Sequence, residues 1–169
     1  AREKMQIDVA DFIRLRLKNV LTERGVRYDV QEAVLSDVDA VADVPVRAAY
    51  VEHLLAADDA AAIVQSFVRV GNIARSASTG AVDSALFAAD EERILLAAYE
   101  TAVELRASGS DDDGTLAVER RLAAAIAAFF DAVMVMDQDE RIKENRLSLL
   151  KSIDDYLLET ADFSKIVLN

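Results

Sequence analysis

Residues that interrupt a helix are scarce in this chain, and this scarcity limits its fold more than any other feature. One proline and five glycines are spread over 169 residues, and alanine, leucine and valine dominate the remainder. Alanine and leucine favour helices, and no segment keeps the strict apolar–polar alternation of a half-buried strand. The sequence therefore predicts an all-α protein, a single helical bundle of about six to seven helices that occupies residues 1–169 as one domain.

Capping residues and apolar periodicity predict where each helix begins and ends. Pro45 suits the first turn of a helix, and Asp58 or Asp59 suits an N-cap. Asp29 and Asp137 are each followed three residues later by Glu, which is the spacing of a capping box. The expected helices cover residues 8–25, 29–37, 45–57, 58–76, 90–107, 116–135 and 137–160.

The helix expected at residues 58–76 separates apolar from polar side chains. Its apolar face carries Ile63, Val64, Phe67, Val70, Gly71 and Ala74. Its polar face carries Gln65, Arg69, Asn72 and Ser76. Because the two sets recur at helical spacing, we expect the first to lie in the core and the second in water.

A polar turn, SGSDDDG at residues 108–114, joins the two long antiparallel helices that precede and follow it. Its carboxylates lack the ligand spacing and closing Glu of a calcium loop, so a solvated turn is favoured over a metal site. Ser, Gly and Asp make no apolar contact, so shortening Gly109–Gly114 should leave the melting temperature nearly unchanged.

The stretch FFDAVMVMDQDERIKENRLSLL, residues 129–150, combines apolar and polar residues in an unusual way. Its two methionines, Met134 and Met136, end a long helix and are expected to pack in the core. Asn145 and Arg146 fall on the apolar stripe of the last helix, where buried polar groups need specific partners.

Several kinds of chemistry are excluded by residue type. The chain has no cysteine and a single histidine, His53, which excludes disulfides and zinc fingers and leaves no histidine-based triad in view. No phosphate loop or nucleophile elbow is present, so we expect no catalytic residue and no metal site. No apolar run is long enough to span a membrane, and residues 1–10 lack the layout of a signal peptide. The sequence is therefore compatible with a reducing, cytoplasmic location. The missing initiator Met suggests an excised piece of a larger protein.

The charge is acidic overall but uneven. Nineteen basic and thirty-one acidic residues give a net charge of −12, yet residues 1–27 carry seven bases against four acids. Basic residues also gather near positions 69–75 and 141–146, and acidic surroundings would focus a polyanion onto such patches. The basic candidates for polyanion binding are Arg14, Lys18, Arg69, Arg75 and Arg141.

Four stretches of sequence point together to one family. The 129–150 stretch is followed by LLETADFSKI at 157–166, and DFIRLRLKNVL at 11–21 and FVRVGNIA at 67–74 precede it. In this order they resemble the C-terminal end of the β subunit of bacterial heterotetrameric glycyl-tRNA synthetase. The tail also resembles the helical DALR-type anticodon-binding domain of arginyl-tRNA synthetase, which has a similar aromatic-x-x-Val-x-Val turn.

The resemblance implies a helical domain that grips the anticodon end of tRNA(Gly) as part of a glycine–tRNA ligase. It implies that the separate α subunit handles ATP and glycine, so this chain would be non-catalytic and hold no cofactor. The implied partners are tRNA(Gly), the remainder of the β subunit and the α subunit of the heterotetramer, with no role for DNA or a membrane. Arg69, Asn72, Asn145 and Arg146 lie in matching motifs and are carried over as tRNA-binding candidates.

Two questions stay open at the level of sequence. Arg146 either pairs with Asp131 or Asp137 and fixes the crossing of the last two helices, or contacts RNA directly. The domain as a whole either binds tRNA or serves as a helical module that docks other subunits without touching RNA. Glycine anticodons share two cytosines, whose exocyclic amines can donate to an Asn carbonyl or a carboxylate while Arg stacks or contacts phosphate.

Overall fold

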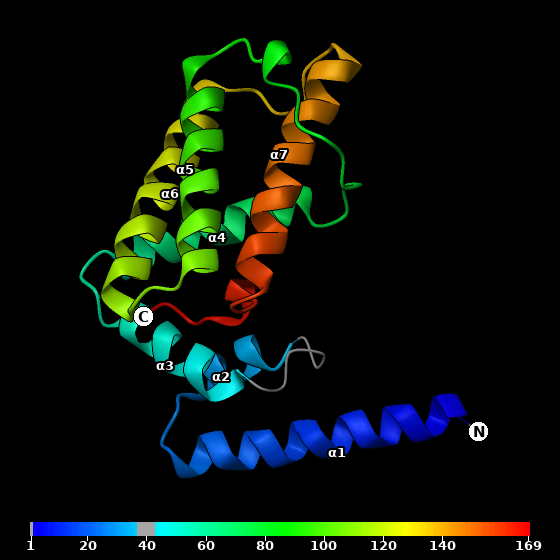
Figure 1. Ribbon diagram of the computed structural model, residues 1–169, viewed down its shortest axis with the longest axis vertical. Helices are drawn as coiled ribbons and strands as arrows, with labels where there is room; N and C mark the ends of the chain where they lie inside the picture. The colour runs from blue at the N-terminus through cyan, green and yellow to red at the C-terminus, as the bar shows by residue number, and fades with distance from the viewer. Residues whose placement is uncertain (1, 37–42) are drawn as a thin grey trace. The chain divides into compact units, whose positions relative to one another are not determined.

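The computed structural model describes residues 2–36 and 43–169, with side chains described from residue 9 onward. Over these residues the chain is helical and has no strand, so the all-α prediction is confirmed (Figure 1). None of the described helices is both long enough and apolar enough to cross a membrane. The elements are α1 (Arg2–Glu23), α2 (Tyr28–Val34), α3 (Val44–Leu55), α4 (Ala60–Ala74), η1 (Ser84–Leu86), α5 (Asp90–Ser108), α6 (Asp112–Ala132), α7 (Glu140–Leu158) and η2 (Phe163–Lys165).

The chain divides into two compact units, residues 1–57 with 158–169, and residues 58–157. That residues 1–169 act as one domain stays a prediction. In the first unit, α2 packs against α3 and η2. Asp29, on α2, is buried and accepts hydrogen bonds from the Arg27 guanidinium and from the backbone N–H of Val167. This carboxylate therefore ties the C-terminal segment to α2.

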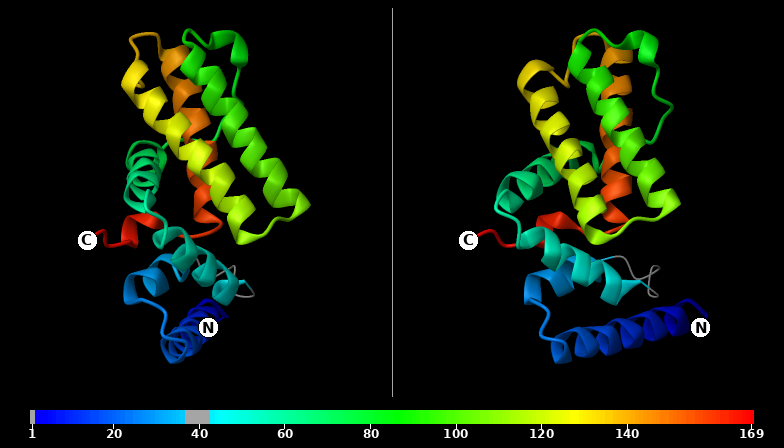
Figure 2. Two further views of the ribbon diagram at one scale, coloured as in Figure 1. Left: turned by 90° about the vertical axis from the view of Figure 1, so that its left-hand side faces the viewer. Right: turned by 60° about the vertical axis from the view of Figure 1, so that its left-hand side comes forward.

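The second unit is built from α4, α5, α6 and α7. In both views of Figure 2, α5 and α6 run side by side in opposite directions, as the sequence predicts for these two long helices. All six residues of the predicted apolar face of α4 are buried, and all four of its polar face are exposed. The core of this unit includes Phe67, Leu95, Leu122, Ile126, Phe129, Leu149, Leu150 and Ile153.

Some predicted helix ends are wrong. α1 begins at Arg2 rather than Asp8, because residues 2–7 contain no residue that would stop a helix. α6 begins at Asp112 rather than residue 116 and ends at Ala132 rather than residue 135. The turn between α5 and α6 is thus shorter than expected, since Asp112–Gly114 already belong to the helix.

The predicted capping boxes are wrong as well. α2 begins one residue before Asp29, so the Asp29 carboxylate lies inside the first turn instead of capping it. Asp59 occupies the N-cap position of α4, as predicted, but its side chain makes no capping hydrogen bond and pairs with Arg120. The Asp137 carboxylate accepts from the N–H of Asp139, and Asp139 in turn accepts from the N–H of Arg141 at the start of α7.

Asp111 caps α6, so shortening Gly109–Gly114 would remove this cap and the first residues of the helix, and the expectation of a nearly unchanged melting temperature does not hold. Removal of the Asp111 side chain alone should measurably destabilise the protein. Its carboxylate accepts a hydrogen bond from the Gly114 N–H at 2.8 Å. Asp111→Ala is expected to lower the free energy of unfolding by about 1 kcal/mol, as for other N-cap losses, in a urea titration followed by circular dichroism. Asp111→Asn is the matched control, because asparagine caps equally well. An unchanged stability of the alanine variant would contradict the capping role.

Candidate functional site

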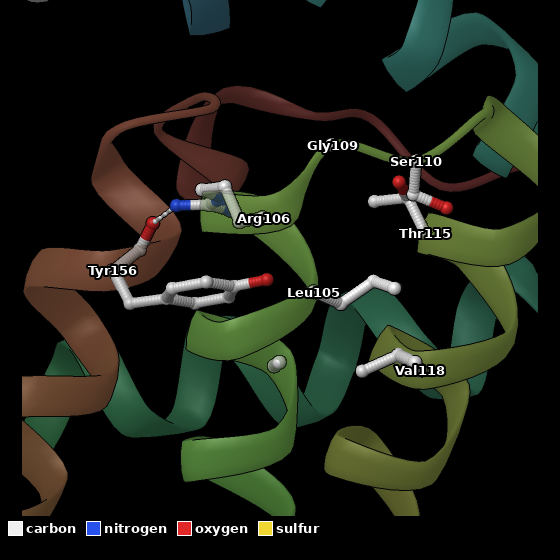
Figure 3. A pocket seen from close by; sticks show the side chains of 8 residues that line it. Leu105, Arg106, Gly109, Ser110, Thr115, Val118 and Tyr156 are labelled. Carbon is white, nitrogen blue, oxygen red and sulfur yellow. Dashed lines mark hydrogen bonds between the residues drawn. The ribbon is translucent and has the colours of Figure 1, made fainter.

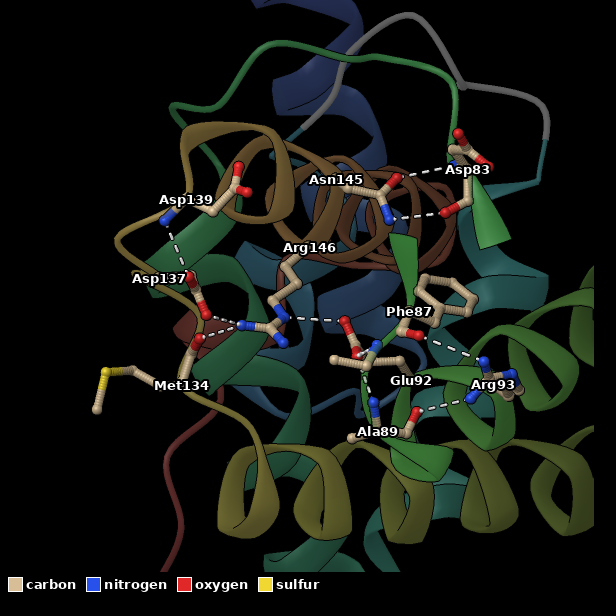
Figure 4. Close-up of polar contacts among 11 residues, drawn as sticks. Asp83, Phe87, Ala89, Glu92, Arg93, Met134, Asp137, Asp139, Asn145 and Arg146 are labelled. Atoms are coloured by element: carbon tan, nitrogen blue, oxygen red, sulfur yellow. Dashed lines mark hydrogen bonds and ion pairs between the residues drawn. The ribbon is translucent and has the colours of Figure 1, made fainter. Parts of the chain in front are cut away.

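Arg146 lies at the centre of a buried polar junction on α7 (Figure 4). Its Nε donates to the Glu92 carboxylate at 2.8 Å, and one terminal nitrogen donates to the Met134 carbonyl at 2.8 Å and to Asp137 at 2.9 Å. The residue is 5% exposed, so these partners lie almost out of water. The side chain thereby joins α7 to the start of α5 and to the segment after α6.

Glu92 is the partner that the sequence did not indicate. Its other oxygen accepts from the backbone N–H groups of Ala88 and Ala89, at 2.8 and 2.9 Å. Burial acts to raise the pKa of Glu92, but the hydrogen bond from Arg146 and the two backbone donors together hold that pKa below its ordinary value. A Glu in the first turn of a helix usually interacts favourably with the helix dipole, so its presence there did not indicate a buried partner. The one available signal was its place three residues after Ala89, the N-cap residue of α5.

Asn145, next to Arg146, anchors the segment that leads into α5. Its side-chain carbonyl accepts from the Asp83 N–H at 2.7 Å, and its amide donates to the Asp83 carbonyl at 2.9 Å (Figure 4). The pairing of Arg146 with Asp137, expected as one of two alternatives, is confirmed. Direct RNA contact by Asn145 or Arg146 stays a prediction.

The residues that follow α6 are not helical, and this overturns the expected burial of the two methionines. The chain leaves the helix at Val133, which has extended backbone angles, and a bend follows at residues 135 and 136. Val133 and Val135 are buried, whereas Met134 is 74% exposed and Met136 is 60% exposed. The prediction that both methionines pack in the core is therefore wrong.

Several predicted basic candidates have carboxylate partners within the protein. Arg14 and Lys18 both lie near the Glu32 carboxylate, at 4.0 and 2.6 Å. The hydrogen bond from Lys18 to Glu32 raises the pKa of Lys18 and lowers that of Glu32. Arg75 pairs with Asp154 of α7 at 3.1 Å. Each of these cations is partly neutralised before any ligand arrives.

Arg69, Asn72 and Arg141 differ from those candidates. All three are exposed, and within the described part of the chain their side chains have no carboxylate or hydrogen-bond partner. Arg69 contacts an aromatic ring instead, since its guanidinium carbon lies 4.2 Å from the centroid of Phe130 on α6. Arg69 therefore keeps its donors available while Phe130 favours one position of its guanidinium.

A pocket of about 350 Å³ opens beside Arg69, between α4 and α6. We call it the α4–α6 pocket. Its lining residues are Ala62, Gln65, Ser66, Arg69, Ile126, Ala127, Phe130 and Asp131. An apolar floor with a few polar groups at the rim is typical of small-ligand sites. Asp131, considered from the sequence as a partner of Arg146, lies here instead.

A second pocket, of about 180 Å³, lies between α5 and α6 near Arg106 (Figure 3). The Arg106 guanidinium carbon lies 3.5 Å from the centroid of the Tyr156 ring. Its terminal nitrogens donate to the Tyr156 carbonyl at 2.6 Å and to Glu119 at 3.5 Å. The cation in this pocket is thus engaged by the protein itself.

Comparison with known proteins shows which family this sequence matches. The family model of the DALR anticodon binding domain matches residues 63–163, from the first turn of α4 through α7 to the first residue of η2. The glycine–tRNA ligase β subunit of Clostridioides difficile is 35% identical over 170 residues, covering 98% of this chain and 25% of the relative.

Two further relatives carry the same name. The glycine–tRNA ligase β subunit of Desulfatibacillum aliphaticivorans is 39% identical over 165 residues, covering 94% of this chain and 24% of the relative. That of Syntrophotalea carbinolica is 38% identical over 168 residues, with the same coverage. The chain spans about a quarter of the length of the curated relatives it matches. The resemblance inferred from the sequence motifs is confirmed.

Proposed function

The chain belongs to the DALR anticodon binding domain family, and we propose that it binds the anticodon end of tRNA(Gly) as part of a glycine–tRNA ligase. In this proposal the chain contributes RNA recognition and no chemistry of its own. ATP and glycine would be used by an α subunit, which would assemble with the rest of the β subunit into a heterotetramer. We also propose that the chain itself holds no cofactor and works in the cytoplasm.

One observation carries the proposal. The matched range contains Arg69, an exposed cation without a carboxylate partner in the described structure, beside the exposed amides of Gln65 and Asn72 on the same helix. A helical RNA reader needs cations for the phosphate backbone and amides or guanidinium planes for unstacked bases. In a chain of net charge −12, acidic surroundings would direct a polyanion to such a cation.

Binding of tRNA(Gly) to the assembled enzyme across a salt series tests the proposal. Arg69→Met should leave folding intact, because the side chain is exposed. It should weaken binding and lower the slope of the log–log salt dependence by a little under one unit, about 0.7 to 0.9, since one phosphate contact is lost.

Arg121→Met is the matched control, because Arg121 is also exposed, lies on α6 and does not line the α4–α6 pocket. It removes the same charge and should change neither affinity nor slope. If Arg69→Met, properly folded, binds like the unchanged enzyme, α4 does not belong to the RNA interface. That result would favour subunit docking.

Docking of other protein parts is the second candidate function, and one feature of α1 favours it. Val9, Phe12 and Leu15 are 52%, 67% and 60% exposed and lie three residues apart, on neighbouring turns of the helix. Three large apolar side chains in a row favour a protein contact over an RNA contact. The two functions use different units of the chain, so both can hold.

A further inference from the structure

We propose that the α4–α6 pocket is a subsite for one unstacked nucleobase, which stacks on the guanidinium of Arg69 and donates its exocyclic amine to Asp131. This inference rests on the proposed function and adds to it a location for one bound base and a preference among bases. It predicts that Arg69 is more than a phosphate contact, and that cytosine or adenine is accepted in preference to uracil.

The shape of the pocket suits a single base. Its volume of about 350 Å³ lies near the lower end of small-molecule sites, which span roughly 300 to 1,000 Å³. Ala62 and Ala127 are exposed and supply apolar surface beside a base, while Gln65, Ser66 and Asp131 supply polar atoms. Sequence-specific RNA recognition commonly inserts a splayed base between such a plane and such edges.

The Arg69 guanidinium is held in place before any ligand binds. It lies over Phe130, and Phe130 is itself fixed by an edge contact with Phe129, with ring centroids 5.4 Å apart and an interplanar angle of 72°. Phe129 has no exposed surface. Phe130 thus favours one position of the guanidinium, which reduces the side-chain freedom lost on binding. Phe130 is a positioning residue in this arrangement.

Arg106 provides an internal comparison for Arg69. Both are arginines that lie over an aromatic ring beside a pocket. The Arg106 donors are used by the Tyr156 carbonyl and by Glu119. Arg69 has no such acceptor in the described structure, so its donors and its pocket-lining surface are available to a base.

The selectivity follows from the acceptors at the rim. The Asp131 carboxylate is exposed, lines the pocket and accepts hydrogen bonds only. The exocyclic amine of cytosine or adenine can donate to it, whereas uracil presents a carbonyl oxygen at the corresponding position and would be repelled. The two cytosines shared by glycine anticodons are therefore the bases to test.

The experiment compares Arg69→Lys with Arg69→Met in the assembled enzyme, using tRNA(Gly) transcripts in which each shared cytosine is unchanged, replaced by uridine or made abasic. Lysine keeps the charge but loses the planar surface. Arg69→Lys is expected to weaken binding roughly 5-fold to 100-fold, the range of base stacking on a protein side chain, with an unchanged salt slope. Its effect should vanish on the transcript that is abasic at the base held in the pocket.

Two further variants test the supporting groups. Phe130→Leu should reproduce the behaviour of Arg69→Lys, because it keeps an apolar side chain but no longer holds the guanidinium; circular dichroism establishes that it is folded. Asp131→Asn should reduce the preference for cytosine over uridine roughly tenfold, because an amide can also donate to a carbonyl oxygen.

The results distinguish a failure of the base subsite from a failure of the proposed function. If Arg69→Met weakens binding and lowers the slope but Arg69→Lys binds normally, Arg69 contacts phosphate only, and the base subsite is overturned while the proposed function stands. Equal weakening by Arg69→Lys on every transcript also overturns the subsite. If Arg69→Met has no effect, the RNA-binding role of α4 fails, and the subsite fails with it.

Discussion

Replacing Arg146 by methionine is expected to lower the free energy of unfolding by roughly 3 to 5 kcal/mol, the cost of leaving a buried charge without its partner. Methionine keeps an apolar stem of similar length but removes the guanidinium. Glu92, whose side chain has no exposed surface, would keep only its backbone donors at Ala88 and Ala89. Urea unfolding followed by far-UV circular dichroism measures the loss.

The double variant Glu92→Gln/Arg146→Met separates two explanations for that loss. It removes both charges, and a neutral amide is much less costly to bury than a carboxylate, so much of the lost stability should return. If the double variant is as unstable as Arg146→Met alone, the loss arises from the contacts with Met134 and Asp137. The explanation by buried charge would then be wrong.

Acid should weaken the same junction. The pKa of Glu92 lies below its ordinary value of 4.5, because the bonds from Arg146 and the backbone outweigh the opposing effect of burial. The folded state therefore binds fewer protons than the unfolded state, so this contribution is complete above about pH 5 and is lost as the pH falls through the folded pKa. The double variant lacks the group and should show a flatter decline in stability below about pH 5.

The α4 helix was predictable because its pattern is local. Apolar residues recur at helical spacing from Ile63 to Ala74, and every residue of the predicted apolar face is buried. The VMVM run at 133–136 was not predictable in the same way. Four apolar residues in succession fit the end of a helix as well as a non-helical segment. Which of the four are buried depends on tertiary packing, which leaves Met134 and Met136 exposed.

The candidate site depended on contacts that no spacing reveals. Arg146 and its partner Glu92 are 54 positions apart, so the sequence indicated that a partner was needed but not which one. Likewise, Arg69 was identified from charge and motif, whereas its neighbours Phe130 and Asp131 lie on a helix distant in sequence. The doublet Phe129–Phe130 was the available signal, since adjacent aromatics on a helix cannot both face the same core.

The second large effect is expected at Arg106. Arg106→Met should lower the free energy of unfolding by about 3 kcal/mol, because Glu119, also without exposed surface, would lose the cation 3.5 Å from its carboxylate. The bond to the Tyr156 carbonyl and the contact with its ring would be lost as well. The Tyr156 hydroxyl would still donate to Glu119, which places the expected value at the lower end of the range for broken buried pairs.

Arg106→Met and Arg69→Met form a matched pair, because each removes a guanidinium from an aromatic ring beside a pocket. The hydrogen-bond partners of the two residues predict opposite results. Arg106 bonds to the protein, so its loss should lower stability; under the proposed function, it should change neither the affinity for tRNA(Gly) nor the salt dependence of binding. Arg69 has no such partner in the described chain, so its loss should change stability by less than about 0.5 kcal/mol and weaken tRNA binding. If Arg106→Met instead keeps its stability and weakens tRNA binding, the pocket beside α5 would be the RNA site, and the assignment of the two arginines would be reversed.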